Sequence, residues 1–324
     1  MRVREGLLRL ILVPALFLLP VPTACGSQSR TVDCGQGGSA VIAGIGSQLA
    51  FACDFEAYGR YLNRDIFTLG TDGAPSRRLT RPYAQDRDPT WSSNGREIAF
   101  SSTRDGRLNV YAMGADGGNV RRLTNALAQE FEPAWSPDGG RIAFASGRGG
   151  AAAPLGPRGL PASLYTVSPD GGGLVRLTHT PSYDGDPAWA PDGSKIAFVS
   201  DRAGATSVWV MNPDGSAQTR LTRSGASDDR PAWSPDGRQI VFARGADEES
   251  STAIFVMDAD GSHQRQLVPG EGREPAWSPD GRWIAFVSDR DGHPNIYVAA
   301  GDGSRVLQLT SDPAPKFRPT WRPR

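Results

Sequence analysis

The chain has 324 residues, with 35 basic and 35 acidic side chains, so its formal net charge at neutral pH is zero. A nucleic-acid-binding domain usually carries a basic excess or a basic stripe, and we therefore expect no nucleic-acid partner. The length would ordinarily suggest two domains, but all-β rings form single domains of this size.

The N-terminal segment has the pattern of a secretory signal. Three arginines precede the apolar stretch Leu10–Leu19, and small residues follow it. A charged region, a short apolar region and a small-residue cleavage site indicate a signal peptide, which we assign to residues 1–24. The apolar stretch is too short for a spanning helix, so a transmembrane anchor is the weaker interpretation.

The residue after this segment is a candidate for lipid modification. Cys25 follows Ala24 and precedes Gly26-Ser27, and the segment resembles the lipobox of bacterial lipoproteins. Residues 25–44 would then be a lipidated tether and lead-in, and we predict a membrane-anchored protein on the extracytoplasmic side. Simple secretion is the alternative.

Two cysteines remain, Cys34 and Cys53. In an oxidising compartment they would pair and tie the lead-in to the folded domain. Two separate buried thiols are the alternative interpretation.

From residue 45 onward the protein is a tandem repeat. A tryptophan recurs at a step of 44 residues, with one step of 54, at Trp91, Trp135, Trp189, Trp233, Trp277 and Trp321. A fixed period of this length indicates a repeat architecture. Within each period, short runs rich in Ile, Val, Phe and Tyr are bounded by Gly, Pro and Asp, which predicts β-strands joined by tight turns.

The expected strands follow one order in every repeat. The innermost carries Pro-x-Trp-Ser, and the second carries Ile-Ala-Phe, as at 142–144. The third is Ile-Tyr-Val or a relative, as at 296–298, and the outermost is Arg-x-Leu-Thr, as at 121–124. Asp-Gly pairs such as Asp236-Gly237 are expected to close the hairpins with both residues at positive φ.

Four short strands in each period predict one blade of a β-propeller, and the count is six blades. The first block has strands at 49–51, 65–67 and 78–80 but no tryptophan-bearing strand, whereas the last tryptophan strand, at 318–322, has no strands after it. We therefore expect an all-β, six-bladed propeller of four-stranded antiparallel blades over residues 45–324. The C-terminal strand would pair with the first blade, close the ring and cover two sheet edges.

Charged residues recur at the start of each innermost strand, beside the axis of the ring. The position three before each tryptophan is occupied by Asp88, Glu132, Asp186, Arg230, Glu274 and Arg318. The position two residues earlier is occupied by Asp86, Glu130, Asp184, Asp228, Gly272 and Lys316. We expect these side chains to converge on one acidic mouth of the channel. Three roles are open for these side chains. They could bind calcium, they could bind a basic segment of a partner, or they could accept hydrogen bonds from backbone amides and arginines of adjacent blades.

Two repeats depart from the pattern in the loop after the second strand. Residues 147–163 contain ten extra residues, and residues 247–251 are acidic. Insertions in a repeat often lie on the binding face; a tolerated surface insertion is the alternative.

No catalytic constellation is recognised. The three histidines, His179, His263 and His293, occupy different repeat positions and are expected to be exposed. No nucleophile elbow or phosphate-binding loop occurs. The tryptophans are best explained as packing between blades rather than as a sugar platform.

The repeat Pro-Ala-Trp-Ser-Pro-Asp-Gly, followed by Ile-Ala-Phe-x-Ser-x-Arg, Ile-Tyr-Val-Met and Arg-x-Leu-Thr, resembles the blades of TolB-type propellers. The TolB family is periplasmic and binds the peptidoglycan-associated lipoprotein and the N-terminal segment of colicins, so the resemblance implies a protein-binding role in the cell envelope. Similar blades occur in oligogalacturonate lyases, which implies polysaccharide binding or cleavage as the alternative.

We therefore predict a monomeric, non-enzymatic envelope protein that binds a protein or peptide at the acidic mouth. Four carboxylates are expected to bind it, with two arginines as counter-charges: Asp88, Glu132, Asp186 and Glu274, with Arg230 and Arg318.

Overall fold

The computed structural model describes residue 34 and residues 47–57, 61–72, 74–81, 83–149, 161–245 and 252–323. The compact unit to which they belong spans residues 33–324. The predicted signal peptide, Cys25, most of the tether and most of the two irregular loops lie outside the described residues. Within the described part, no helix has the length and apolar character needed to cross a membrane.

The described part of the unit consists of six antiparallel sheets, each with four strands. The first contains β24 (Lys316–Trp321), β1 (Gln48–Ala57), β2 (Tyr61–Gly70) and β3 (Arg77–Arg78). The second contains β4 (Asp86–Trp91), β5 (Glu97–Ser102), β6 (Asn109–Gly114) and β7 (Arg121–Arg122). The third contains β8 (Glu130–Trp135), β9 (Ile142–Ser146), β10 (Ser163–Val167) and β11 (Val175–Arg176), with the 3-10 helix η1 (Gly147–Gly149) after β9.

The remaining sheets repeat this order. The fourth contains β12 (Asp184–Trp189), β13 (Ile196–Ser200), β14 (Ser207–Met211) and β15 (Thr219–Arg220). The fifth contains β16 (Ser227–Trp233), β17 (Gln239–Gly245), β18 (Ala253–Asp258) and β19 (Arg265–Gln266). The sixth contains β20 (Arg273–Trp277), β21 (Trp283–Ser288), β22 (Asn295–Ala300) and β23 (Val306–Gln308). The predicted six-bladed propeller is confirmed, and the sheets are called blades 1 to 6 in this order.

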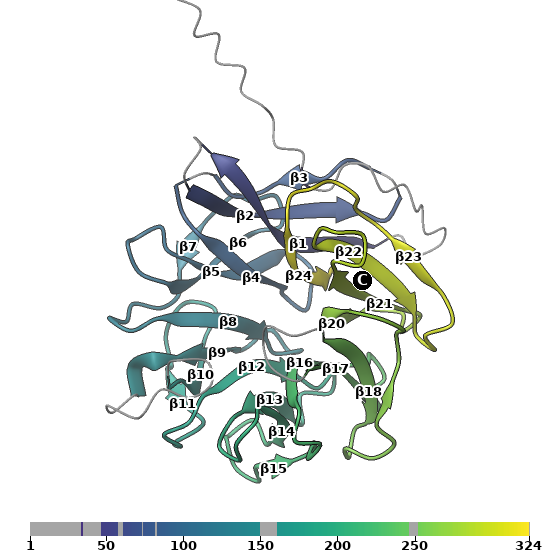
Figure 1. Cartoon of the computed structure of the whole chain (residues 1–324). Coiled ribbons are helices and arrows are strands. Elements are labelled where there is room, and N and C mark those ends of the chain that lie inside the picture. Colours follow the sequence, from purple (N-terminus) through teal and green to yellow (C-terminus); the bar gives the residue numbers. More distant parts are fainter. Residues whose placement is uncertain are drawn as a thin grey trace, which may run out of the picture. The chain divides into compact units, whose positions relative to one another are not determined.

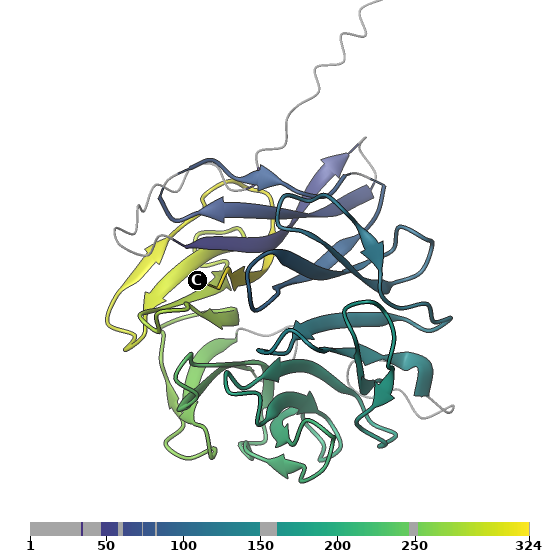
Figure 2. The same cartoon turned by 180° about the vertical axis from the view of Figure 1, so that it is seen from behind.

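The ring is closed by the two ends of the propeller, as predicted. Strand β24 pairs antiparallel with β1, with Trp321 opposite Leu49 and Lys316 opposite Cys53. The two strands lie side by side in Figures 1 and 2 although they stand at opposite ends of the sequence. Because β24 supplies the innermost strand of blade 1, the inner edge of β1 is paired, and blade 1 has the same four-strand order as the other blades.

A disulfide adds a second fastening near this seam. Cys34 and Cys53 are joined, with their Cα atoms 6.3 Å apart, and both residues are fully buried. The bond ties a residue of the lead-in to the middle of β1.

The hairpin turns differ from the sequence prediction. In the segment Ser136–Gly139, the backbone N–H of Gly139 donates to the carbonyl of Ser136 at 2.9 Å. Only Gly139 of this turn has a positive φ, 71°, so the expectation of positive φ at both residues is wrong. Asp138 instead uses its side chain, which accepts the N–H of Gly140 at 2.9 Å. This is a turn with proline at its second position and a left-handed glycine at its end.

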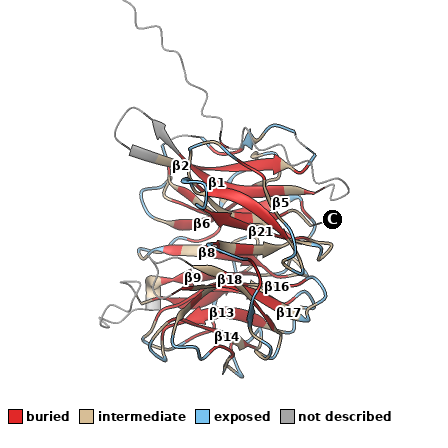
Figure 3. Ribbon diagram, turned by 45° about the vertical axis from the view of Figure 1, so that its right-hand side comes forward, coloured by how far each residue is buried: buried red, intermediate tan, exposed pale blue. Residues whose placement is uncertain are grey.

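The core repeats with the blades (Figure 3). Each blade buries one phenylalanine of its second strand completely, namely Phe51, Phe100, Phe144, Phe198, Phe242 and Phe286. The tryptophans fill the space between neighbouring blades: Trp135 packs with Val110 of blade 2 and Ile142 of blade 3. The indole N–H of Trp233 also donates to the carbonyl of Ala188 in blade 4 at 3.2 Å. The interpretation of the tryptophans as packing between blades is confirmed.

Candidate functional site

Every innermost strand contains a β-bulge at the residue three before its tryptophan. In blade 2, the register shifts between Arg87 and Thr90, so that two residues of β4 oppose one residue of β5. The second of the two is Pro89, which has no N–H to donate to the sheet. A bulge redirects a side chain relative to the regular strand, and here it turns the charged residue toward the axis.

The six bulged residues share a strained backbone. All have φ between 49° and 58°, and they are Asp88, Glu132, Asp186, Arg230, Glu274 and Arg318. A left-handed conformation costs a residue with a side chain roughly 1 kcal/mol or more. These six residues are called the charged ring. Strain repeated at one position of six blades is a reason to examine that position for function.

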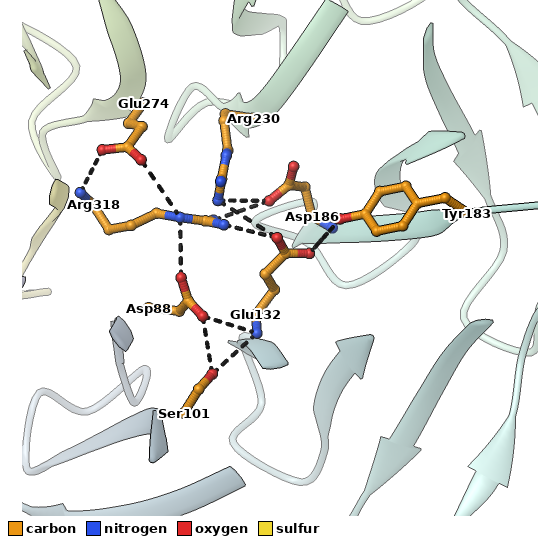
Figure 4. Close-up of polar contacts among 8 residues, drawn as sticks. All are labelled: Asp88, Ser101, Glu132, Tyr183, Asp186, Arg230, Glu274 and Arg318. Carbon is orange, nitrogen blue, oxygen red and sulfur yellow. Dashed lines mark hydrogen bonds and ion pairs between the residues drawn. The ribbon is translucent and has the colours of Figure 1, made fainter. Parts of the chain in front are cut away.

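Arg318 holds the charged ring together across the axis (Figure 4). Its guanidinium lies 3.0 Å from the Asp186 carboxylate of blade 4, on the opposite side of the ring. It also lies 2.8 Å from Glu132, 3.2 Å from Asp88 and 3.8 Å from Glu274. Arg230 contributes a second cation, 2.9 Å from Asp186 and 3.6 Å from Glu132.

The same carboxylates bind the backbone of the next blade. Glu132 accepts the N–H of Asp186 at 2.7 Å, and Glu274 accepts the N–H of Arg318 at 2.7 Å. The N–H of Glu132 lies 3.4 Å from Asp88 and 3.2 Å from the Ser101 hydroxyl. Three roles are open for these carboxylates from the sequence alone. The contacts observed here are those of the third role, in which the carboxylates bind backbone amides and arginines of neighbouring blades.

The carboxylates of the charged ring are largely buried. Their side chains are only 2% to 13% exposed. Burial raises the pKa of the Glu274 carboxyl, and the nearby Arg230 guanidinium opposes that rise. With two cations among four carboxylates, the ring retains two net negative charges when all six groups are ionised.

Below the ring, the channel is built from layers contributed equally by the blades. The bulged residues are followed by a layer of six prolines, then by six alanine or threonine residues, then by five of the six tryptophans, since Trp91 is not part of the lining. These layers enclose a volume of about 290 Å³, called the inner cavity. A second volume of about 290 Å³, the mouth cavity, lies on the other side of the ring and includes Arg87, Leu108, Phe131, Tyr183 and Phe317 in its wall.

The charged ring separates the two cavities. Five of its residues line both, and Asp186 lines only the inner cavity. The carboxylates therefore lie within the channel rather than at its mouth. The described wall of the mouth cavity carries the carboxylates of Asp88, Glu132 and Glu274 and the guanidiniums of Arg64, Arg87, Arg230 and Arg318. In this described wall the guanidiniums outnumber the carboxylates by one, so the expected excess of acidic groups is not found among these residues.

The second charged series does not face the channel. Its carboxylates are Asp86, Glu130, Asp184 and Asp228, all fully buried, and none of them lines either cavity. Each pairs with an arginine of its own blade: Asp184 with Arg202 at 2.7 Å and Asp86 with Arg104 at 3.2 Å. The other two pair in the same way, Glu130 with Arg148 and Asp228 with Arg244. The prediction that these residues bind at the mouth is wrong.

These arginines were missed as partners although the sequence carries a signal for them. In blades 2, 3 and 4 they occupy the last position of Ile-Ala-Phe-x-Ser-x-Arg, whereas in blade 5 Arg244 takes the place of the serine, two residues earlier. Each guanidinium also lies over an aromatic ring of its blade, as Arg202 lies 4.8 Å from the centre of the Trp209 ring. Where the acid is replaced by Gly272, Arg290 donates to the carbonyl of Glu271 at 2.8 Å instead. In blade 1, Lys316 is fully buried and pairs with Asp312.

The remaining candidates lie away from the channel. His179, His263 and His293 are exposed, as expected. In the described part of the protein, no group of three or more His, Cys, Asp or Glu side chains is placed to hold a metal ion. The ring carboxylates Asp88, Glu132 and Asp186 instead contact the Arg318 guanidinium.

Known proteins share this architecture. The TolB from Acinetobacter baumannii superposes with a TM-score of 0.71 at 19% identity, over 86% of this chain and 67% of that one. A putative TolB from Agrobacterium tumefaciens gives 0.62 at 21% identity, over 86% of this chain and 100% of that one. An oligogalacturonate lyase from Vibrio parahaemolyticus gives 0.55 at 16% identity, over 81% and 79% of the two proteins.

At these identities the superpositions establish the fold alone. The sequence, however, matches the TolB beta propeller domain over residues 44–153, 155–252 and 229–324, which together span most of its length. The chain therefore belongs to the TolB beta propeller domain family.

Proposed function

We propose that this protein is an exported, lipid-anchored scaffold of the cell envelope that holds a short segment of a protein partner in the mouth cavity. The domain plan is a signal peptide at 1–24, a tether lipidated at Cys25 and extending to residue 44, and the propeller from residue 45. The propeller acts as a monomer in this proposal and carries out no chemistry of its own.

The observation that carries the proposal is the charged ring that crosses the channel. Arg318 contacts carboxylates on both sides of the axis, so a ligand entering from the mouth meets an ion-paired floor. The mouth cavity is thus a recess of about 290 Å³, at the small end of ligand sites. Such a recess suits a few side chains of a partner, with the rest of the partner resting on the surrounding loops.

The ring chemistry favours binding over catalysis. General acid–base catalysis needs a carboxyl group that is free to exchange a proton with a substrate. Here Glu132 is tied to Arg318, to Arg230 and to the N–H of Asp186. Glu274 is tied to the N–H of Arg318. Because Glu132 and Glu274 are already engaged in these contacts, they are better suited to forming the floor of the mouth cavity than to acting as an acid–base pair.

The test places a photo-crosslinking amino acid at position 129, since Gln129 lines the mouth cavity. The matched control is position 174, where Leu174 is exposed and belongs to neither cavity lining. In cells, we expect one dominant protein adduct at position 129 and none at 174, with a single partner segment identified by mass spectrometry. Equal adducts at both positions, or none at 129, would contradict the proposal.

The anchoring is tested separately. Mass spectrometry of the mature N-terminus should find a lipid-modified Cys25, and Cys25→Ser should release the protein from the membrane fraction. An unmodified N-terminus at another residue would refute the anchor and leave the binding site unaffected.

A polysaccharide ligand is the second candidate, because the fold is shared with an oligogalacturonate lyase. Oligogalacturonates added to the purified protein should give no ultraviolet-absorbing unsaturated products if the propeller is a protein-binding scaffold. Product formation would establish the lyase alternative.

A further inference from the structure

The mouth cavity contains one arginine that differs from the others in its wall. Arg318 and Arg230 are paired with ring carboxylates. Arg64 is paired with Asp54 at 2.6 Å. Arg87 forms no ion pair with any residue in the described part of the protein, and its buried Nε–H has no hydrogen-bond partner there.

An unsatisfied guanidinium N–H in this position is costly to the free protein. Removing a polar N–H from water without a partner costs about 1–3 kcal/mol, and more when the group is charged. Arg87 is half-buried, and it stands directly before the bulged residue Asp88 in β4. The bulge turns both neighbours toward the channel, so Arg87 lines the mouth cavity beside Asp88.

Two aromatic residues share the cavity wall with Arg87. The equivalent residues of the adjoining blades are Phe317 in blade 1 and Phe131 in blade 3, and both line the same cavity. The equivalent arginine of blade 6, Arg273, is paired with Asp289 at 3.1 Å. Arg87 thus shares the wall with two aromatic rings, and the Arg64 guanidinium lies 3.8 Å from the centre of one of them, Phe317. A guanidinium that has no carboxylate partner among the described residues is an attractive donor for an anion in the cavity.

We propose that Arg87 is the specificity-determining residue of the mouth cavity and binds a carboxylate of the partner segment. The carboxylate is either the C-terminal carboxylate of the partner or an Asp or Glu side chain, and an adjacent apolar side chain packs on Phe131 and Phe317. The planar fork of a guanidinium matches a carboxylate with two parallel hydrogen bonds. This inference rests on the proposed protein-binding function and reverses the expected charge of the ligand from basic to acidic.

A peptide carboxylate fits the wall better than an acidic sugar. Sugar hydroxyls need many acceptors, and the carboxylates in this wall are already occupied, Glu132 by two arginines and Asp88 by Arg318 and Ser101. A peptide needs one anion site and an apolar surface, and both are present in the cavity wall.

The experiment uses four probes in millimolar titrations followed through the Arg Nε–H signals of labelled protein. They are the peptide acetyl-Ala-Leu-Phe-Ala-Leu with a free C-terminus, the same peptide as its C-terminal amide, the amide with a glutamate at its last position, and trigalacturonate. Arg87→Gln identifies the Arg87 signal and tests its role, and Arg87→Lys keeps the charge without the fork. The control is Arg305→Gln, because Arg305 is exposed and lines neither cavity.

We expect at least one carboxylate peptide to bind about tenfold more tightly than the neutral amide, the value for one charge-assisted contact. Its binding should shift the Arg87 signal, and the preference should disappear in Arg87→Gln, shrink in Arg87→Lys and persist in Arg305→Gln. The two carboxylate peptides distinguish a C-terminal carboxylate from an acidic side chain.

Two results would overturn the inference in different ways. Peptide binding without any preference for a carboxylate, or a preference that survives Arg87→Gln, removes the role of Arg87 but leaves the proposed function standing. Saturable binding of trigalacturonate with no peptide binding removes both, and it assigns the cavity to acidic sugars.

Discussion

Replacing Arg318 by methionine removes the cation that spans the channel while keeping most of the side-chain length. Four carboxylates then face one remaining guanidinium, that of Arg230, and the net charge of the ring changes from two to three negative charges. Removing one partner of a buried ion pair costs about 3–5 kcal/mol, because the other charge stays buried without compensation. Since Arg230 still contacts Asp186 and Glu132, we expect a loss near the lower end, about 3 kcal/mol.

The assay is urea unfolding of the purified protein, with the stability change taken from the transition midpoint at constant slope. The matched control is Arg305→Met, which alters an exposed arginine and should change stability by no more than about 0.5 kcal/mol. The second variant, Arg318→Met with Glu274→Gln, restores the original net charge of the ring and should recover part of the loss. The loss should also shrink as the pH falls, because burial raises the pKa of the Glu274 carboxyl and its protonation removes one uncompensated negative charge from the ring.

Equal stability of Arg318→Met and Arg305→Met would refute this reasoning. It would mean that the ring carboxylates are compensated by water or by other groups and that Arg318 is not the element that holds the channel closed.

Three further predictions concern the scaffold. Deleting residues 316–324 removes β24 and its pairing with β1, so thermal unfolding should lose its cooperativity. Deleting only residues 323–324 should leave the melting curve nearly unchanged. Similar curves for the two truncations would contradict the argument that β24 closes the ring. Burial raises the pKa of the Asp65 carboxyl to about 6 from 3.8, so the folded state holds this proton more tightly than the unfolded state. The protonated carboxyl stabilises the folded state below about pH 4, and this stabilisation is lost as the pH rises through 6. In urea unfolding, the free energy of unfolding of Asp65→Asn should therefore rise by up to about 3 kcal/mol relative to that of the wild type between these pH values. A difference that does not change with pH would argue against this. Replacing Cys34 and Cys53 by alanine opens the bond across 19 residues and should cost about 3 kcal/mol, whereas a reductant should lower the melting temperature of the wild type but not that of the double variant.

The fold could be predicted from the sequence because each blade is encoded by local signals. Short apolar runs, Asp-Gly turns and the tryptophan period each specify one blade without reference to the others. The unpaired tryptophan strand at 318–322 then leaves a single arrangement that completes blade 1. The turn prediction was wrong because Asp138 accepts hydrogen bonds through its side chain at negative φ, which leaves the left-handed position to glycine alone.

The site was predicted in part. Residues two apart in a regular strand face the same side, so Asp86 and Asp88 were expected together at the mouth. The β-bulge breaks this period: Asp86 points into its blade toward Arg104, while Arg87 and Asp88 line the mouth cavity. The proline after each charged residue was the available sign of a bulge, and the repeated arginine of the second strand was the available sign of the buried pairs.

The sequence by itself determined the number of blades, the closure of the ring and which six charged residues recur three places before the tryptophans, because these follow from a repeated local pattern. Only the tertiary structure decided how the charges are used. Arg318 and Asp186 are separated by 132 positions in the sequence and meet at 3.0 Å across the axis, a distance set by the diameter of the closed ring and by the direction in which each bulge turns its side chain. The charge of the described cavity wall also depends on that geometry. Most of its arginines are paired with carboxylates of neighbouring strands, whereas Arg87 has no ion pair among the described residues.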